Sequence, residues 1–240
     1  MGRLACRVRG DKALEDDRTR MMGRPVTEQN FESLRKAMVA SQLRTTAVND
    51  PRVVAAMGAV ARERFVPADQ AAFAYVDAAL PLAPGRAMPA PMVLGRLLTE
   101  ARVRATDHAL VVGSGGGYAA AVLATLVHDV VALEEDATLT ALARGPLPAN
   151  VTAVSGPLVE GWAAAAPYDL ILFDGAIEVV SATIVAQLAD GGRIAAPILD
   201  AGVVRLAIGR KAGDGFGLSS FADAAAPALP GFAQPAGFRF

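Results

Sequence analysis

Four glycines within five residues, Gly113, Gly115, Gly116 and Gly117, separate an apolar run at 109–112 from an alanine-rich run at 119–127. Glycine lets the backbone approach a ligand where a side chain would block it, and the first turn of a helix offers N–H groups without a partner inside the helix. A strand, a glycine turn and a helix start in this order predict a site for a nucleoside-type ligand. We expect the backbone amides of this loop, that of Ser114 included, to lie bare toward the ligand. The alternative is that the glycines merely permit a tight turn.

An acidic residue stands where such a site needs one. Glu134 ends the next apolar run, about 20 residues after the first glycine, and an acidic side chain at this distance commonly holds the hydroxyls of a ribose. The alternative is a solvated strand end, because Glu135 and Asp136 follow directly. Tyr118 stands where the dinucleotide pattern G-x-G-x-x-G needs its third glycine, which disfavours a nicotinamide cofactor. We interpret Tyr118 as a packing residue at the helix start.

Two further residues could take part in chemistry. Asp174 ends the predicted strand 170–174, at the carboxyl edge of a sheet, where ligands bind in such folds. It could contact a ligand, or it could cap a helix that begins near Glu178. Arg86 could attract a carboxylate, although an ordinary solvated arginine is the plainer interpretation.

The sequence gives metal chemistry little support. His108 and His128 are its only histidines, and neither has a partner at ligand spacing. We expect both at the surface. The single cysteine, Cys6, excludes an internal disulfide and says nothing about metal. We therefore predict no metal site.

The second half of the chain alternates short apolar runs with helical ones. This alternation is typical of a parallel sheet covered by helices on both faces. We predict strands at 109–112, 130–134, 151–154, 170–174 and 193–198, helices at 117–127, 137–143 and 178–189, and a closing hairpin at 203–208 and 216–220.

The first half is predicted to be mainly helical. Thr27 is placed to cap a helix that runs to about Arg44. Asp50-Pro51 is a strong start for a second helix, and a third covers 92–102. The intervening segment 77–91 holds four prolines and a glycine, which predicts an irregular loop.

Composition excludes several classes of protein. The formal charge of −1, without a basic stripe, argues against a nucleic-acid partner. No apolar stretch approaches the roughly 18 residues that a membrane span needs. Residues 1–25 are rich in arginine and aspartate and lack the apolar centre of a signal peptide. We interpret them as a disordered leader, or as an extension of the gene model ahead of a true start at Val26.

Several short motifs carry a more specific signal. They are RERFVP at 62–67, YVD at 75–77 followed by LP at 80–81, the loop GSGGGY at 113–118, APYD at 166–169, and QL at 187–188 followed by GGR at 191–193. Together they resemble the protein-L-isoaspartate O-methyltransferases, class I enzymes that use S-adenosylmethionine (SAM). The G-x-G-x-G loop is the version found in SAM-dependent methyltransferases.

The resemblance implies an α/β fold and a division of the chain. The expected fold is a Rossmann-like class I methyltransferase three-layer sandwich, with a mainly parallel seven-stranded sheet and an N-terminal helical subdomain. The expected parts are the leader 1–25, a helical and acceptor-loop region at 26–105, a SAM-binding core at 106–200, and a hairpin with a covering loop at 201–240.

The resemblance also assigns roles to residues. The glycine loop would cradle the methionine part of SAM, and Glu134 would hold the ribose. Gly156 and Pro157 occupy the turn where similar enzymes place an adenine-binding aspartate, so this aspartate is absent here. The acceptor loop would comprise Leu80, Pro81, Ala87, Met88, Pro89 and Pro91. Pro89 stands where the family carries a Ser or Thr, so we assign no catalytic residue, and Asp174 could face SAM or the acceptor.

The function implied is methylation of the carboxylate of damaged aspartyl residues in protein repair. The cofactor would be SAM and the partners would be proteins or peptides carrying isoaspartyl residues, with no nucleic acid or membrane involved. The enzyme would be a cytoplasmic monomer. The substitutions at 87, 89 and 157 leave two alternatives open: a non-catalytic descendant that binds SAM or a protein partner, and a methyltransferase for a different acceptor.

Overall fold

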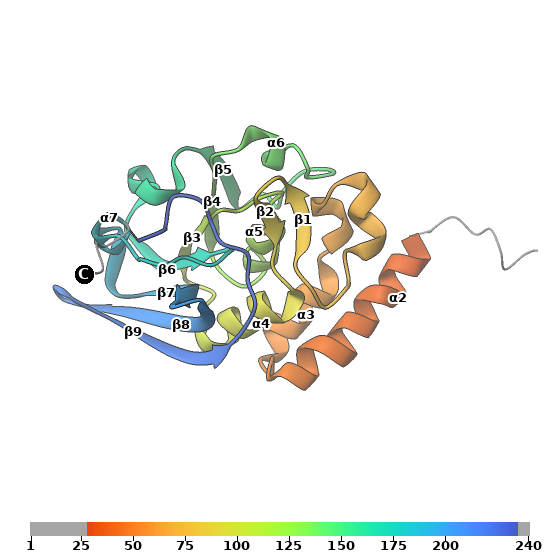
Figure 1. The fold of residues 1–240 in the computed structure, drawn as a ribbon, viewed down its shortest axis with the longest axis horizontal. Coiled ribbons are helices and arrows are strands. Elements are labelled where there is room, and N and C mark those ends of the chain that lie inside the picture. Colours follow the sequence, from red (N-terminus) through yellow and green to blue (C-terminus); the bar gives the residue numbers. More distant parts are fainter. Residues whose placement is uncertain (1–27, 235–240) are drawn as a thin grey trace, which may run out of the picture.

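The computed structural model of the protein describes residues 28–234. The predicted leader 1–25, the Thr27 cap and Cys6 lie outside the described residues. One large sheet dominates the structure, with seven strands in the order β5-β4-β3-β6-β7-β8-β9 (Figure 1). Strands β5 to β7 run parallel, and β8 and β9 continue the sheet antiparallel. This arrangement confirms the predicted fold class.

The strands lie close to their predicted positions. Their bounds are β3 (His108–Val112), β4 (Asp129–Glu134), β5 (Val151–Ser155), β6 (Tyr168–Phe173), β7 (Leu188–Asp200), β8 (Val203–Ala212) and β9 (Gly215–Asp223). The helices of the first half are α2 (Glu28–Met38), α3 (Pro51–Ala59) and α4 (Pro91–Glu100). Those of the second half are shorter than predicted: α5 (Tyr118–Leu123), α6 (Ala137–Thr140) and α7 (Ala182–Ala186). None of the helices in residues 28–234 is long and apolar enough to cross a membrane.

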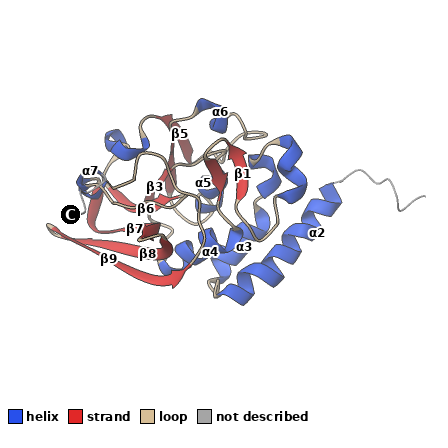
Figure 2. Ribbon diagram, in the orientation of Figure 1, coloured by secondary structure: helices blue, strands red, loops and turns tan. Residues whose placement is uncertain are grey.

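Alternate residues of the central strands face two separate cores. In β3, Ala109 and Val111 pack with α3, α4 and α5, whereas Leu110 and Val112 pack with α7 and the segment after β9. A strand buried on both faces reads as a continuous apolar run, which is why the sequence pattern identified these strands. Figure 2 shows the helix-rich first half of the chain beside the strand-rich second half, with α2 at the opposite end of the molecule from the β8–β9 hairpin.

The first helix changes its hydrogen-bond pattern before it ends. The predicted helix to Arg44 is α-helical to Met38 and continues as a π-helical turn, Val39–Leu43, and a short 3₁₀ turn, Arg44–Thr46. The hydroxyls of Ser41 and Thr45 donate to carbonyls four residues earlier, at 2.7 and 2.6 Å. Such bonds compete with the regular ladder and distort it.

The predicted irregular loop 77–91 is wrong in part. It contains a small antiparallel hairpin, β1 (Leu80–Ala83) and β2 (Arg86–Met88), which is separate from the main sheet. Both strands are edge strands, and an edge strand tolerates a proline because one side of it needs no hydrogen bonds. Leu80 and Met88 are buried in the first core and fix the base of the hairpin.

The predicted helix 178–189 is also too long. Its start pairs with the C-terminal segment, and its end, at Leu188, is already part of β7 and pairs with Tyr168 of β6. The amides of Ala176 and Glu178 donate to Pro227 and Phe232 of the C-terminal segment, at 2.7 and 3.2 Å, so the chain is extended there. Helix α7 begins only after Ser181, which caps it. In Figure 1 the dark-blue segment after β9 returns across the sheet toward α7. We call residues 224–234 the C-terminal strap.

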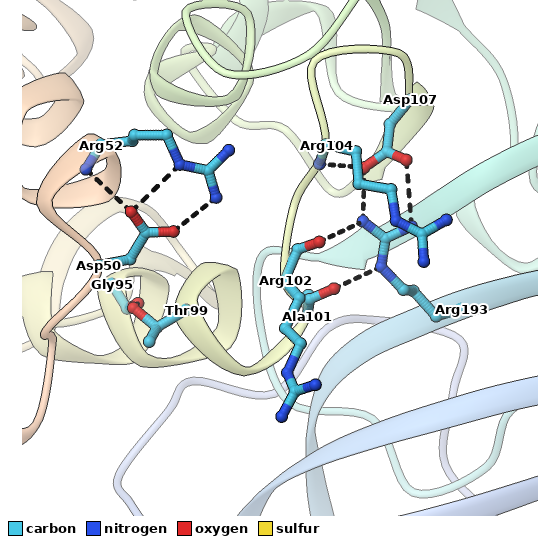
Figure 3. A network of polar contacts seen from close by, with 9 residues as sticks. All are labelled: Asp50, Arg52, Gly95, Thr99, Ala101, Arg102, Arg104, Asp107 and Arg193. Atoms are coloured by element: carbon cyan, nitrogen blue, oxygen red, sulfur yellow. Dashed lines mark hydrogen bonds and ion pairs between the residues drawn. The ribbon is translucent and has the colours of Figure 1, made fainter.

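A buried arginine ties the helical half to the sheet. Arg193 of β7 pairs with Asp107, at the start of β3, and both side chains are almost fully buried. Arg193 also donates to the carbonyls of Ala101 and Arg102 after α4 (Figure 3). It donates to the carbonyl of Asp169 as well, at 3.0 Å. Burying an ion pair is tolerable because each polar atom of the guanidinium finds a partner.

Arg193→Met should therefore destabilise the protein strongly. It leaves the carboxylate of Asp107 buried without its counter-charge, which typically costs about 3–5 kcal/mol. The matched control is Arg52→Gln, which removes a half-exposed pair with Asp50 that Figure 3 also shows and should cost at most about 1 kcal/mol. The measurement is the free energy of unfolding in urea. Equal losses in the two variants would contradict the structural role of Arg193.

Candidate functional site

The glycine loop connects β3 to α5 and depends on its glycines for conformation. Gly113, Gly115 and Gly117 all have positive φ, at 75°, 55° and 95°. Residues with a Cβ rarely adopt this region. The loop therefore needs glycine at these three positions for its shape alone.

The expectation that the loop amides lie bare is wrong. The amides of Gly113 and Ser114 both donate to the carbonyl of Leu133 at 3.0 Å, and that of Gly117 donates to the carbonyl of Ser114 at 2.8 Å. The amide of Gly115 donates to the carboxylate of Glu134 at 2.8 Å. A buried N–H group is costly without an acceptor. Strand β4 supplies the acceptors for Gly113, Ser114 and Gly115, and the loop itself supplies the one for Gly117.

Side chains from three segments lie directly against the loop. A Cβ at Gly113 would come within 2.7 Å of Leu229 of the C-terminal strap, and one at Gly115 within 3.1 Å of Leu82 of the β1–β2 hairpin. A Cβ at Gly117 would come within 2.9 Å of Leu147. In this structure the protein itself therefore fills much of the space that the glycines leave. We call the surface formed by the glycine loop and Glu134, which the hairpin and the strap cover, the cradle.

Glu134 anchors the cradle at the tip of β4. Its carboxylate is fully buried, so the interpretation as a solvated strand end is wrong. Besides the amide of Gly115, it accepts hydrogen bonds from the amides of Glu135 and Asp136, at 3.0 and 3.1 Å. Its remaining donors are the two Nη atoms of Arg86, at 2.8 and 2.7 Å. Burial opposes ionisation of Glu134, but Arg86 and the backbone amides outweigh it and lower its pKa.

Arg86 is not the solvated arginine that the sequence suggested. Its side chain is 9% exposed and forms a bidentate ion pair with Glu134. The hairpin turn at Pro84-Gly85 carries β2 back over the glycine loop and thereby places the guanidinium on the carboxylate. Sequence reasoning missed this contact, although Arg86 is the one basic residue in the segment 77–91 and a buried acid needs a cation.

Asp174 lies beside the glycine loop. Its backbone amide donates to the carbonyl of Val112, the last residue of β3. It caps no helix, since α7 begins after Ser181, so the capping interpretation is wrong. Within residues 28–234 its carboxylate makes no hydrogen bond and is only partly covered. Burial raises the pKa of Asp174 to about 7, although Arg62 and Arg86 pull it down.

Arg62 holds the acceptor loop from beneath, a role that sequence reasoning missed. It is 1% exposed, donates to the carbonyls of Ala74 and Pro89 at 2.7 and 2.6 Å, and lies over the ring of Tyr118 at 4.7 Å. Tyr118 is itself buried, which confirms its packing role. One guanidinium thus connects Pro89 of the acceptor loop to the helix that follows the glycine loop.

The other acceptor-loop residues divide between core and surface. Leu80 pairs with Met88 and Pro81 with Ala87 across the hairpin. Leu80 and Met88 are buried, whereas Pro81 is exposed and Ala87 partly exposed. Pro91 is the first residue of α4.

The predicted adenine turn reaches the same end of the sheet. Gly156 follows β5, whose last residue, Ser155, is in register with Glu134. A Cβ at Gly156 would lie 3.3 Å from the ring of Trp162, so an aromatic side chain borders the turn that Pro157 continues. The structure thus brings Gly156 and Pro157 next to Glu134 without a carboxylate at either position.

The histidines are not both at the surface. His108 is partly buried, contacts Asp129 and the carbonyl of Ala165 at 2.8 Å each, and stacks on Tyr168. Among residues 28–234, no group of three or more histidine, cysteine, aspartate or glutamate side chains could hold a metal ion.

Comparison with known proteins identifies the family. A sequence model of the protein-L-isoaspartate(D-aspartate) O-methyltransferase family matches residues 33–219. The chain belongs to this family. It is 39% identical over 170 residues to the protein-L-isoaspartate O-methyltransferase of Methylorubrum populi, covering 70% of this chain and 80% of that one. It is 38% identical over 178 residues to that of a Synechococcus strain, covering 72% and 73%.

Solved structures confirm the class I methyltransferase fold. A protein-L-isoaspartate O-methyltransferase-like protein from Plasmodium falciparum, solved with S-adenosyl-L-homocysteine, aligns with a TM-score of 0.70 at 18% identity, covering 81% of this chain and 97% of that one. A second protein-L-isoaspartate O-methyltransferase aligns with a TM-score of 0.69 at 20% identity, covering 82% and 66%.

Asp174 yields a prediction about pH. Since the folded protein keeps the proton of Asp174 up to about pH 7 and the unfolded chain releases it near its ordinary, lower pKa, stability falls as the pH rises between these values. Asp174→Asn removes this loss. Its melting temperature should exceed that of the wild type at about pH 8 by more than it does at about pH 5.

The matched control is Asp214→Asn, at an exposed aspartate in the β8–β9 turn where asparagine also fits before glycine. It should shift the melting temperature equally at both pH values. A pH-independent difference between Asp174→Asn and the wild type would refute the raised pKa of Asp174.

Proposed function

We propose that the protein is a SAM-dependent protein-L-isoaspartate O-methyltransferase that methylates the carboxylate of damaged aspartyl residues. The observation that carries the proposal is the junction of Glu134 with the glycine loop, where the carboxylate accepts from the amide of Gly115 at 2.8 Å. Membership of the family and the fold support it. We propose further, from the same resemblance, that it works as a monomer in the cytoplasm.

The residues around the cradle suit a cofactor of this kind. Glu134 is an ionised acceptor at the tip of the second strand of the core, where it would hold the ribose hydroxyls. Gly113, Ser114, Gly115 and Gly117 would border the methionine part, with Gly156 and Pro157 on the adenine side. The carboxylate of Asp174, without a hydrogen bond of its own, would face the positively charged part of the ligand.

Methyl transfer to a carboxylate mainly requires the protein to position the two reactants. SAM supplies a methyl group on a sulfonium. An oxygen of the acceptor carboxylate attacks the methyl carbon as the carbon–sulfur bond breaks, its electron pair stays on sulfur, and a methyl ester forms. A carboxylate is ionised at neutral pH, so no general base is required and positioning supplies most of the rate. Proline at 89 therefore does not forbid the reaction, although it removes a hydroxyl that could hold the acceptor.

A second candidate function is supported by the packing of the cradle. Leu82 and Leu229 lie against the glycines, Arg86 covers Glu134, and prolines stand at 89 and 157. A non-catalytic descendant that binds SAM, its product or a protein partner would tolerate these features, and so would a methyltransferase for another acceptor.

A transfer assay separates these candidates. The protein is incubated with methyl-labelled SAM and an isoaspartyl peptide, and the labile ester is measured as methanol released in mild alkali. The matched control is the same peptide with normal aspartate. We expect label from the isoaspartyl peptide alone. SAM binding without any transfer would favour the non-catalytic descendant. Transfer to neither peptide but to another acceptor would favour a methyltransferase for that acceptor.

Gly115→Val should abolish SAM binding. Valine would strain the backbone at φ 55° and press its Cβ against Leu82 at 3.1 Å, thereby moving the loop. The matched control is Gly213→Val in the β8–β9 turn, where φ is also 55° but no heavy atom lies within 4 Å of a Cβ. Both variants carry a similar backbone strain of about 1–3 kcal/mol. Calorimetry with SAM should show binding only in the control, and persistent binding in Gly115→Val would mean that the loop is not the site.

A further inference from the structure

The contact between Arg86 and Glu134 competes with the proposed cofactor. One oxygen of Glu134 accepts from Arg86 and from the amides of Glu135 and Asp136, and the other accepts from Arg86 and from the amide of Gly115. A carboxylate offers about four lone-pair sites. These five donors leave no site for the two hydroxyls of a ribose. A diol can bind Glu134 in the proposed manner only if the guanidinium leaves.

The hairpin that carries Arg86 is built so that its tip can move without disturbing the sheet. Strands β1 and β2 pair only with each other, and their register is irregular between Pro81 and Ala83. At the turn, Pro84 and Gly85 are exposed, and no heavy atom lies within 4 Å of a Cβ at Gly85. Two-stranded hairpins are marginally stable by themselves.

The base of the hairpin is fixed, in contrast to the tip. Leu80 and Met88 are 4% and 3% exposed in the first core. Arg62 holds the carbonyl of Pro89, the next residue, at 2.6 Å. Any displacement is therefore confined to residues 82–86, which hold the two side chains that face the cradle from this side, Leu82 and Arg86.

We propose that Arg86 is an autoinhibitory latch: its ion pair with Glu134 holds the hairpin tip over the cradle, and SAM binds only by displacing it. The inference rests on the proposed function in one respect, the identity of the ligand. The bidentate, charge-assisted pair is the strong kind of side-chain hydrogen bond, so the latch lowers the affinity for SAM. Opening it releases Leu82 from Gly115 and Arg86 from Glu134 in one movement of the tip.

Arg86→Gln tests the latch in two ways. Without ligand, amide hydrogen exchange at residues 82, 83, 85 and 86 should become at least fivefold faster than in the wild type. With ligand, the Kd for SAM measured by calorimetry should fall at least fivefold. Arg86→Lys keeps the charge but loses the bidentate geometry. Its exchange rate and its Kd for SAM should lie between those of Arg86→Gln and the wild type. Arg52→Gln, which removes an arginine–carboxylate pair remote from the cradle, should match the wild type in both measurements.

The outcomes distinguish the latch from the proposed function. Unchanged exchange in Arg86→Gln overturns the latch, and so does a Kd for SAM that is equal to or higher than that of the wild type. If neither the wild type nor any variant binds SAM, the proposed function fails. Faster exchange in Arg86→Gln would then still show that the ion pair of Arg86 with Glu134 fixes the hairpin tip. Should Arg86→Gln not fold because Glu134 loses its counter-charge, the double variant Arg86→Gln/Glu134→Gln removes both charges, and its exchange rate decides the same question.

Discussion

A carboxylate that is removed from water at the tip of a strand must be surrounded by donors, and Glu134 organises the functional end of this molecule through that requirement. Its partners come from the glycine loop, from its own strand end and from a hairpin 48 residues earlier in the chain. Satisfying this one buried charge holds the amide of Gly115 and draws Arg86, with the tip of its hairpin, over the cradle. A neutral side chain at this position would leave the hairpin without its main polar contact with the core.

The covered cradle is compatible with membership of the family because the site has two distinct parts, the sheet with its glycine turn and the segments that cover them. The parallel sheet is the feature shared with the solved structures of the family, and it and the glycine turn are buried in the core. The side chains that cover them come from the β1–β2 hairpin, which is separate from the main sheet, and from the strap, which pairs with Ala176 after β6. Coverage by such segments changes access to the site and leaves its frame intact.

The sequence predicted the frame well because its signals are local. Apolar runs of β3, β4 and β6 bury both faces, and the glycines stand where the chain must turn with positive φ. It failed where contacts over long sequence distances decide the structure. The four prolines of 77–91 concealed a hairpin, the start of the predicted helix 178–189 pairs with the strap, and the burial of Arg86 depends on an acid that nothing nearby in the sequence reveals. The prediction that Asp174 could cap a helix was wrong for the same reason: the strap pairs with the chain at Ala176 and Glu178, so the helix begins only after Ser181.

Arg62 has a consequence for how this part of the molecule tolerates sequence change. It secures residues 74 and 89 through their carbonyl oxygens, and every amino acid carries a carbonyl. The anchoring at these two points therefore does not depend on which side chains stand at 74 and 89. A segment anchored through its main chain can change its side chains at the anchor points while its path stays constant, and the alanine at 87 and the proline at 89 are compatible with that path.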